Sequence, residues 1–252
     1  MQLKNAMAAA IVAAALTGGA YSEQAAAVDV DITFVIDRSG SMGGEFSFLG
    51  GAIGGFLNDL QGDSRIDSAQ AALVSYLGSA RLESGLTSDA TALQSAFAGV
   101  PASGGTENAL IAVDAAIPGG NANLGIAYRP GTVRSIVLIT DEDADDENSY
   151  SNSFGTGPTA LGALLDQQGF LNNVIFDQGG FDNPETSFNP IARPTGATFD
   201  ITDFRDDRPG FFAEFTRVKI GEIVNQVPEP GVLGLMGVAL LGMGATRRRR
   251  RG

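Results

Sequence analysis

The chain has 252 residues, of which 44% are hydrophobic, and its formal charge is −13. Between residues 28 and 226, 27 acidic and 10 basic side chains give a formal charge of −17, which disfavours binding to nucleic acid or to an anionic membrane surface. Because the sequence contains no cysteine and no histidine, it excludes disulfides, thiolate metal sites, cysteine catalysis and a Ser-His-Asp hydrolase.

Residues 1–27 are typical of a secretory signal peptide. A short basic start precedes an apolar run from Ala6 to Leu16, and small residues follow that run. This order of segments is the pattern that export machinery recognises and a signal peptidase removes. Cleavage after Ala20, Ser22 or Ala27 fits the pattern, and the sequence does not decide among them.

Alternating strands and helices are predicted between residues 28 and 226. Apolar β-branched runs indicate buried strands, and apolar residues at helical spacing indicate helices. In chain order we expect strand 32–36, helix 43–60, strands 70–77 and 81–85, helices 88–97 and 107–117, strand 133–140, helix 159–168, strands 173–177 and 197–201, and helix 210–225. The glycine- and proline-rich stretches 119–131 and 178–195 are expected to be surface loops. The alternation predicts an α/β fold, a doubly wound, Rossmann-like and mainly parallel sheet flanked by helices.

Residues 227–252 form a separate C-terminal tail. The sequence Val227-Pro228-Glu229-Pro230 precedes an apolar segment, residues 231–245, and five arginines, Arg247–Arg251. The apolar segment is slightly short for a membrane-spanning helix, and the arginines favour the cytoplasmic side. This order resembles the PEP-CTERM sorting signal of Gram-negative bacteria. The resemblance implies membrane attachment through the tail, recognition by an exosortase-type protease and delivery to the cell surface. A plain single-pass anchor is the alternative.

Polar side chains follow two predicted strands and precede one predicted helix. Asp37, Ser39 and Ser41 come directly after the first strand, and Asp141 follows the clearest strand of the chain. Thr106 ends a glycine-containing loop before a helix. In an open parallel sheet, ligands bind beyond the carboxyl ends of the strands, so these two carboxylates and three hydroxyls can converge. Taken singly, each residue has an alternative role in capping a helix, in a turn or at a strand end.

The residues at these three places resemble the metal-ion-dependent adhesion site, or MIDAS, of the von Willebrand factor A (vWA) domain family. The matching segments are Asp37-Arg38-Ser39-Gly40-Ser41-Met42, Gly104-Gly105-Thr106 and Thr140-Asp141, and the resemblance covers residues 29–225. It implies a metal site formed by Asp37, Ser39, Ser41, Thr106 and Asp141, with no catalytic residue.

Oxygen-only ligands of this kind suit a hard divalent cation, for which Mg²⁺ is the first expectation and Mn²⁺ or Ca²⁺ the alternatives. Because three of the expected ligands are neutral hydroxyls, the bound ion stays electrophilic. An open coordination position can then accept a carboxylate from a partner protein.

The chain departs from the family pattern directly after the second aspartate, where many members have glycine. Residues 141–147 carry six acidic side chains in seven positions. We expect this run to be a solvated acidic loop. A second Ca²⁺ site within Asp143–Glu147 is the alternative.

The sequence therefore predicts an exported, non-enzymatic surface or extracellular protein that mediates metal-dependent protein binding or adhesion, for example in the matrix of a biofilm or of exopolysaccharide. One alternative is a structural matrix component that associates with itself. Another is a metal-dependent hydrolase in which Glu142 or Asp143 acts as the base. A cytosolic chelatase-type subunit of the same fold disagrees with the signal peptide.

Overall fold

The computed structural model describes residues 27–180, 183–192 and 196–226. The predicted sorting tail, residues 227–252, and all of the predicted signal peptide except Ala27 lie outside these ranges. Within the described ranges, none of the helices combines the length and the apolar character that a membrane crossing requires. The predicted membrane segment, residues 231–245, is not among the described residues.

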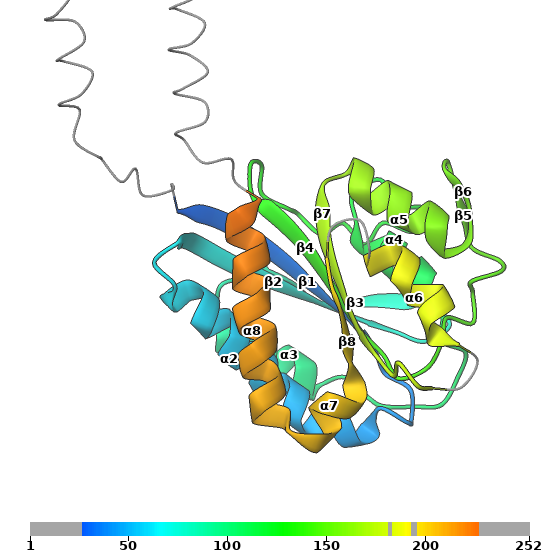
Figure 1. The fold of residues 1–252 in the computed structure, drawn as a ribbon, viewed down its shortest axis with the longest axis horizontal. Coiled ribbons are helices and arrows are strands. Elements are labelled where there is room, and N and C mark those ends of the chain that lie inside the picture. The colour runs from blue at the N-terminus through cyan, green and yellow to red at the C-terminus, as the bar shows by residue number, and fades with distance from the viewer. Residues whose placement is uncertain (1–26, 181–182, 193–195, 227–252) are drawn as a thin grey trace, which may run out of the picture. The chain divides into compact units, whose positions relative to one another are not determined.

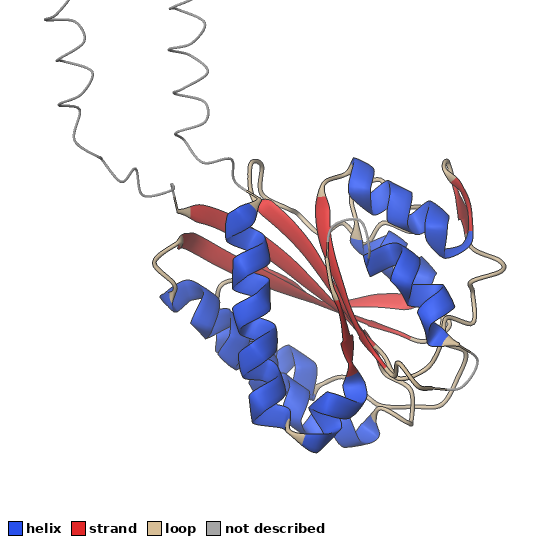
Figure 2. Cartoon of the chain, viewed as in Figure 1, coloured by secondary structure: helices blue, strands red, loops and turns tan. Residues whose placement is uncertain are grey.

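A six-stranded sheet lies at the centre of the fold, in the order β3-β2-β1-β4-β7-β8 (Figures 1 and 2). All neighbouring strands are parallel except β2 and β3, which are antiparallel. The strands are β1 (Val28–Asp37), β2 (Ile66–Tyr76), β3 (Ala80–Thr87), β4 (Val133–Ile139), β7 (Phe170–Phe176) and β8 (Thr198–Asp200). The predicted doubly wound α/β fold is therefore confirmed.

Helices cover both faces of this sheet (Figure 1). One face carries α2 (Gly43–Gly62), α3 (Ala90–Ala98), α7 (Ile201–Asp206) and α8 (Arg208–Asn225). The other face carries α4 (Ala109–Ala116), α5 (Gly157–Gln167) and α6 (Pro184–Ala192). A two-stranded ribbon, β5 (Ser151–Asn152) and β6 (Gly155–Thr156), precedes α5.

Buried side chains on the central strand hold the helices against the sheet. The Phe34 ring of β1 meets the edge of Phe56 from α2 at 5.8 Å between ring centroids, and Phe56 lies 5.4 Å from Phe215 of α8. All three rings are buried, and each such burial contributes about 1.5–3 kcal/mol to stability. These contacts fix the position of β1, whose carboxyl end carries Asp37.

The stretch Gln178–Thr195, expected to be a loop, contains the helix α6, so that prediction was wrong. Pro184 occupies the first position of this helix, where no backbone N–H is needed. Pro190 lies inside the helix and removes a hydrogen bond there. Phe188 and Ile191 are fully buried in the core between helix and sheet, and their burial offsets the loss.

The last predicted strand is shorter than expected. Strand β8 ends at Asp200, and Ile201, predicted to be in the strand, begins α7. The Asp200 side chain accepts hydrogen bonds from the backbone N–H of Thr202 at 2.9 Å and so caps the new helix. In the same way Asp207 accepts from the N–H of Gly210 at 3.2 Å, and α8 begins two residues before the predicted start.

Candidate metal centre

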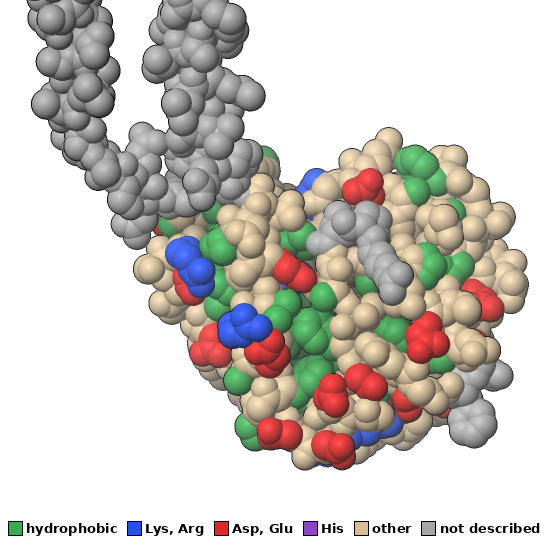
Figure 3. Space-filling view, in the orientation of Figure 1, with side chains coloured by type: hydrophobic (Ala, Val, Ile, Leu, Met, Phe, Trp, Pro, Cys, Tyr) green, Lys and Arg blue, Asp and Glu red, His purple; other side chains and the backbone are tan. Residues whose placement is uncertain are grey.

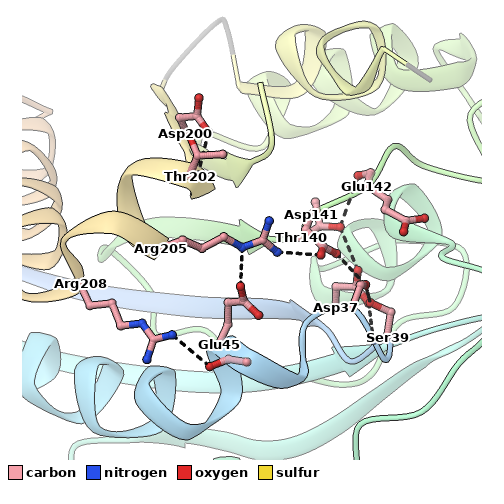
Figure 4. Close-up of polar contacts among 12 residues, drawn as sticks. Asp37, Ser39, Glu45, Thr140, Asp141, Glu142, Asp200, Thr202, Arg205 and Arg208 are labelled. Carbon is pink, nitrogen blue, oxygen red and sulfur yellow. Dashed lines mark hydrogen bonds and ion pairs between the residues drawn. The ribbon is translucent and has the colours of Figure 1, made fainter. Parts of the chain in front are cut away.

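Asp37 lies at the carboxyl end of β1, beside the end of β4. The register of the two parallel strands pairs Ile36 with Ile139, so the next residues, Asp37 and Thr140, are neighbours. The Thr140 hydroxyl donates to Asp37 Oδ2 at 3.0 Å, and the Ser39 backbone N–H donates to Asp37 Oδ1 at 2.7 Å (Figure 4). Asp37 is fully buried, and these two donors fix the direction of its carboxylate.

A chain of hydroxyls joins the two strand ends. The hydroxyl oxygens of Ser39 and Ser41 are 2.8 Å apart, and the Ser41 hydroxyl donates to Asp141 Oδ1 at 3.0 Å. Ser39 and Asp141 are buried, whereas Ser41 is exposed. The structure thus brings together four of the five predicted ligands, Asp37, Ser39, Ser41 and Asp141, of which Ser41 is exposed.

The fifth predicted ligand, Thr106, lies apart from this group. Thr106 is exposed, and helix α4 begins three residues later, at Ala109. In the part of the chain that the structure describes, no hydrogen bond joins its hydroxyl to the other four residues. The adjacent Glu107 is buried, and single carboxylate oxygens of Asp37, Glu107 and Asp141 lie within 4.8 Å of one another. Glu107 was not among the site residues predicted from the sequence, where its only signal was its place next to Thr106.

The acidic run that follows Asp141 holds the loops of the site together. Asp145 Oδ2 accepts a hydrogen bond from the Glu107 backbone N–H at 2.7 Å. The Asp146 carboxylate accepts from the N–H groups of Leu110 at 3.1 Å and Ile111 at 2.7 Å, at the start of α4. Asp146 is 1% exposed, so the expectation of a solvated loop was wrong at this position.

The carboxylate of Glu147, at the end of the same run, accepts a hydrogen bond from the Ser187 hydroxyl of α6 at 2.7 Å. The acidic side chains at positions 145–147 thus accept hydrogen bonds from N–H and O–H groups of the protein itself. A second cation site in this run stays an untested alternative.

Arg205 links the site to α7 and to the first turn of α2. Its Nη2 donates to Asp141 Oδ2 at 2.9 Å, and its Nε donates to Glu45 Oε1 at 2.5 Å. Figure 4 shows the guanidinium between these two carboxylates. Because Glu45 and Asp141 are both buried, Arg205 supplies the positive charge that balances them. This contact spans 160 residues between Glu45 and Arg205, and no local pattern predicts it.

Two carboxylates of the site, Asp37 and Glu107, have raised pKa values. Burial raises the pKa of Asp37 above its usual range, and the nearby charge of Asp141 adds to this effect. Burial, together with a hydrogen bond to Asp37, raises the pKa of Glu107 to about 9, so this carboxyl holds its proton at neutral pH in the metal-free protein.

The donor set fits a divalent cation. It offers carboxylate and hydroxyl oxygens, and Glu107 Oε2 is buried without a hydrogen-bond partner. A cation is the group that relieves both the crowding of negative charge and the unpaired oxygen.

Comparison with known proteins identifies two segments. The sequence-family model of the von Willebrand factor type A domain matches residues 31–207, and that of the PEP-CTERM protein-sorting motif matches residues 226–251. No match was found among curated protein sequences.

Solved structures with similar folds include proximal thread matrix protein 1 from the mussel byssus, in a structure described with a zinc-occupied MIDAS motif. It is 19% identical, with a TM-score of 0.52. The match covers 72% of this chain and 45% of that chain, so this chain spans less than half of that protein's length. The vWF domain of the type V pili tip protein Mfa5 from Porphyromonas gingivalis is 15% identical, with a TM-score of 0.58, over 79% of this chain and 97% of that one.

BatB from Bacteroides thetaiotaomicron is 14% identical, with a TM-score of 0.54, over 77% of this chain and 98% of that one. At these identities the likeness concerns the fold alone. Because the family model covers more than half of the chain and the sheet order and helix layers agree with it, this protein belongs to the von Willebrand factor type A domain family.

Proposed function

We propose that the domain binds a divalent cation and uses it to hold a carboxylate of a partner protein outside the cell. Its ligands are Asp37, Ser39, Ser41 and Asp141, with Thr106 as the further ligand that the sequence predicts. The observation that carries the proposal is the cluster itself, in which buried carboxylates and serine hydroxyls from two adjacent strand ends meet beside the exposed Ser41.

When bound, the cation would supply a positive centre with an affinity for anionic groups. The chain's own residues prepare that position. Thr140 and the Ser39 backbone orient Asp37, and Arg205 orients Asp141. Ser41 is exposed, so a partner's side chain can approach the site at this residue. Preformed donors of this kind lower the entropy cost of binding.

The sorting motif supports a surface location. A PEP-CTERM motif at residues 226–251 implies export, membrane anchoring and exosortase recognition in a Gram-negative bacterium. Together with the predicted signal peptide, residues 1–27, the motif supports a location on the cell surface or, after processing, in the extracellular matrix. Two of the similar structures come from a pilus tip and a byssal thread matrix, which supports a role in adhesion or assembly.

The metal site is tested by thermal unfolding of the purified protein with Mg²⁺, Mn²⁺ or Ca²⁺ against EDTA. A cation present at 100 times its Kd adds about 2.7 kcal/mol of stability, a rise of roughly 5–10 °C in melting temperature for a domain of this size. Asp37→Ala is expected to abolish the rise. Because loss of a buried residue also risks unfolding, Ser41→Ala, which removes one exposed hydroxyl, is the second variant, and the exposed Ser88→Ala is its control. A wild-type melting temperature that no cation changes contradicts the proposal.

The partner is tested by capture from bacterial surface extracts in Mg²⁺ and elution with EDTA. Proteins that wild type retains and Ser41→Ala releases are the expected result. Light scattering with and without EDTA identifies the alternative, in which the captured protein is a second copy of this chain. A hydrolase screen with Asp141→Asn as the control tests the enzymatic alternative.

A further inference from the structure

We propose that Glu107, rather than Thr106, completes the cation site and gives it a preference for Ca²⁺ over Mg²⁺. This inference rests on the proposed function, because it concerns the same site. It replaces a neutral hydroxyl in the expected ligand set with a third carboxylate.

The first observation is the spacing of the carboxylates. Single oxygens of Asp37, Glu107 and Asp141 lie within 4.8 Å of one another. Because each Ca²⁺–oxygen bond measures about 2.3–2.6 Å, two oxygens on the same ion are at most about 5 Å apart. The three carboxylates therefore lie close enough together to share one Ca²⁺.

The second observation is the unpaired oxygen of Glu107. Its side chain is only 6% exposed, and its Oε2 is buried with no hydrogen-bond partner. Buried carboxylate oxygens normally have partners, and one that is left free beside two other carboxylates is available as a ligand for a cation. The exposed Thr106 shows neither feature.

The third observation is the support behind Glu107. Its backbone N–H donates to Asp145 Oδ2 at 2.7 Å, and its C=O accepts from the Asp145 N–H at 3.1 Å. This two-sided contact comes from the acidic run in which the chain departs from the family pattern. The departure therefore has a structural effect, since it holds a glutamate against the site in the loop from which a threonine ligand was expected.

The number of carboxylates affects the choice of ion. Mg²⁺ requires near-ideal octahedral geometry and is usually held by one or two carboxylates and several waters. Ca²⁺ accepts six to eight oxygens in flexible geometry, including carboxylates that bind through both oxygens. A third carboxylate on a loop fixed by its own backbone thus suits the larger ion.

The test is isothermal titration of the full purified protein with Ca²⁺ and with Mg²⁺, comparing wild type, Glu107→Gln and the matched neighbour Thr106→Ala. We expect Glu107→Gln to weaken Ca²⁺ binding roughly 10–100-fold, and Mg²⁺ binding by a smaller factor. Thr106→Ala is expected to change both affinities less than about threefold.

Unchanged Ca²⁺ affinity in Glu107→Gln, or a loss confined to Thr106→Ala, overturns the role of Glu107. An equal loss for both ions overturns the preference for Ca²⁺. If Glu107→Gln does not fold, Glu107→Asp, which keeps the charge on a shorter side chain, takes its place. We expect Glu107→Asp to lose Ca²⁺ affinity by a larger factor than Mg²⁺ affinity, with both factors smaller than those of Glu107→Gln. If the wild-type protein binds neither ion, the proposed function itself is refuted. If the wild-type protein binds and both variants bind with equal affinity, only this inference is refuted.

Discussion

Lys219 of α8 is a fully buried cation on the sheet face opposite α4 to α6. Its Nζ donates to Asn173 Oδ1 of β7 and, at 3.2 Å, to Glu222 Oε2 one turn further along the helix. Burial lowers the pKa of Lys219 to about 8, and the nearby Glu222 opposes that shift only in part. The folded protein therefore releases a proton that the unfolded chain, with a lysine pKa of 10.5, still binds.

This difference predicts a dependence of stability on pH. Between pH values of about 8 and 10 the unfolded state binds more protons at Lys219 than the folded state, so the contribution of this residue to stability rises with pH. The free energy of unfolding of wild type, relative to Lys219→Met, is expected to increase by about 2 kcal/mol from about pH 7.5 to about pH 9.5. Urea unfolding of both proteins across this range measures it.

Comparing two proteins is necessary because Glu107 has the opposite effect. Its folded pKa of about 9 is above the usual 4.5, so its contribution to stability falls as pH rises between those values. Lys219→Met keeps that contribution and removes only the lysine. A difference between the two proteins that does not change with pH contradicts the prediction.

The sequence predicted the residues of the site that follow from strand order, and not those that depend on contacts between loops. Asp37 and Asp141 are recognisable because each directly follows an apolar strand, and parallel strands end at the same edge. Glu107 lies in the site because Asp145 binds its backbone. Arg205 lies in the site because α7 packs beside α2. Neither contact leaves a pattern in the local sequence.

The start of α4 depends on a side chain from another element. Asn108, at the N-cap position, makes no side-chain hydrogen bond to the helix, and Asp146 from the loop after β4 accepts from two of its first N–H groups. We expect Asp146→Ala to lower the free energy of unfolding by about 1–3 kcal/mol, because two amide groups at the buried start of α4 lose their acceptor. Chemical denaturation in EDTA measures the change.

The matched control is Glu142→Ala, which removes an exposed carboxylate from the same acidic run. It is expected to change the free energy of unfolding by less than about 0.5 kcal/mol. Equal effects of the two substitutions would indicate that the general charge of the run, and not the cap, determines stability.

Among the helices and strands, apolar periodicity predicted the long elements and failed at short ones rich in proline. β4 and α8 follow clear apolar patterns. In the segment that forms α6, Pro184 and Pro190 indicate a loop in the sequence. Burial of Phe188 and Ile191 stabilises a helix there instead. Burial of this kind depends on the sheet beneath, and the sequence pattern alone does not contain it.

Across the whole domain, acidic side chains greatly outnumber basic ones. Figure 3 shows acidic groups gathered along the lower edge of the described domain, where Figure 1 places α7 and the start of α8. A pocket of about 540 Å³ in this region is lined by Asp203, Asp206 and Glu214 beside Phe199 and Phe211. Like charges at this density repel one another in the folded state.

Screening of this repulsion by salt is expected to stabilise the domain. In EDTA, raising the KCl concentration from low to physiological ionic strength should raise the melting temperature by about 2–4 °C, equivalent to ~1 kcal/mol. Differential scanning calorimetry measures the shift. A melting temperature that falls with added KCl would show that attractive ion pairs, such as those of Arg205, outweigh the repulsion.

The two outer strands of the sheet have a consequence for how this protein can meet its neighbours. β8 has only three residues, and β3 carries Arg81 and Glu83, which pair with each other at 2.7 Å. Strands from other chains add most readily to long, flat and uncharged edges. Both edges of this sheet therefore discourage amyloid-like stacking at high local concentration, and we expect the domain to join an assembly through side chains rather than through a shared sheet.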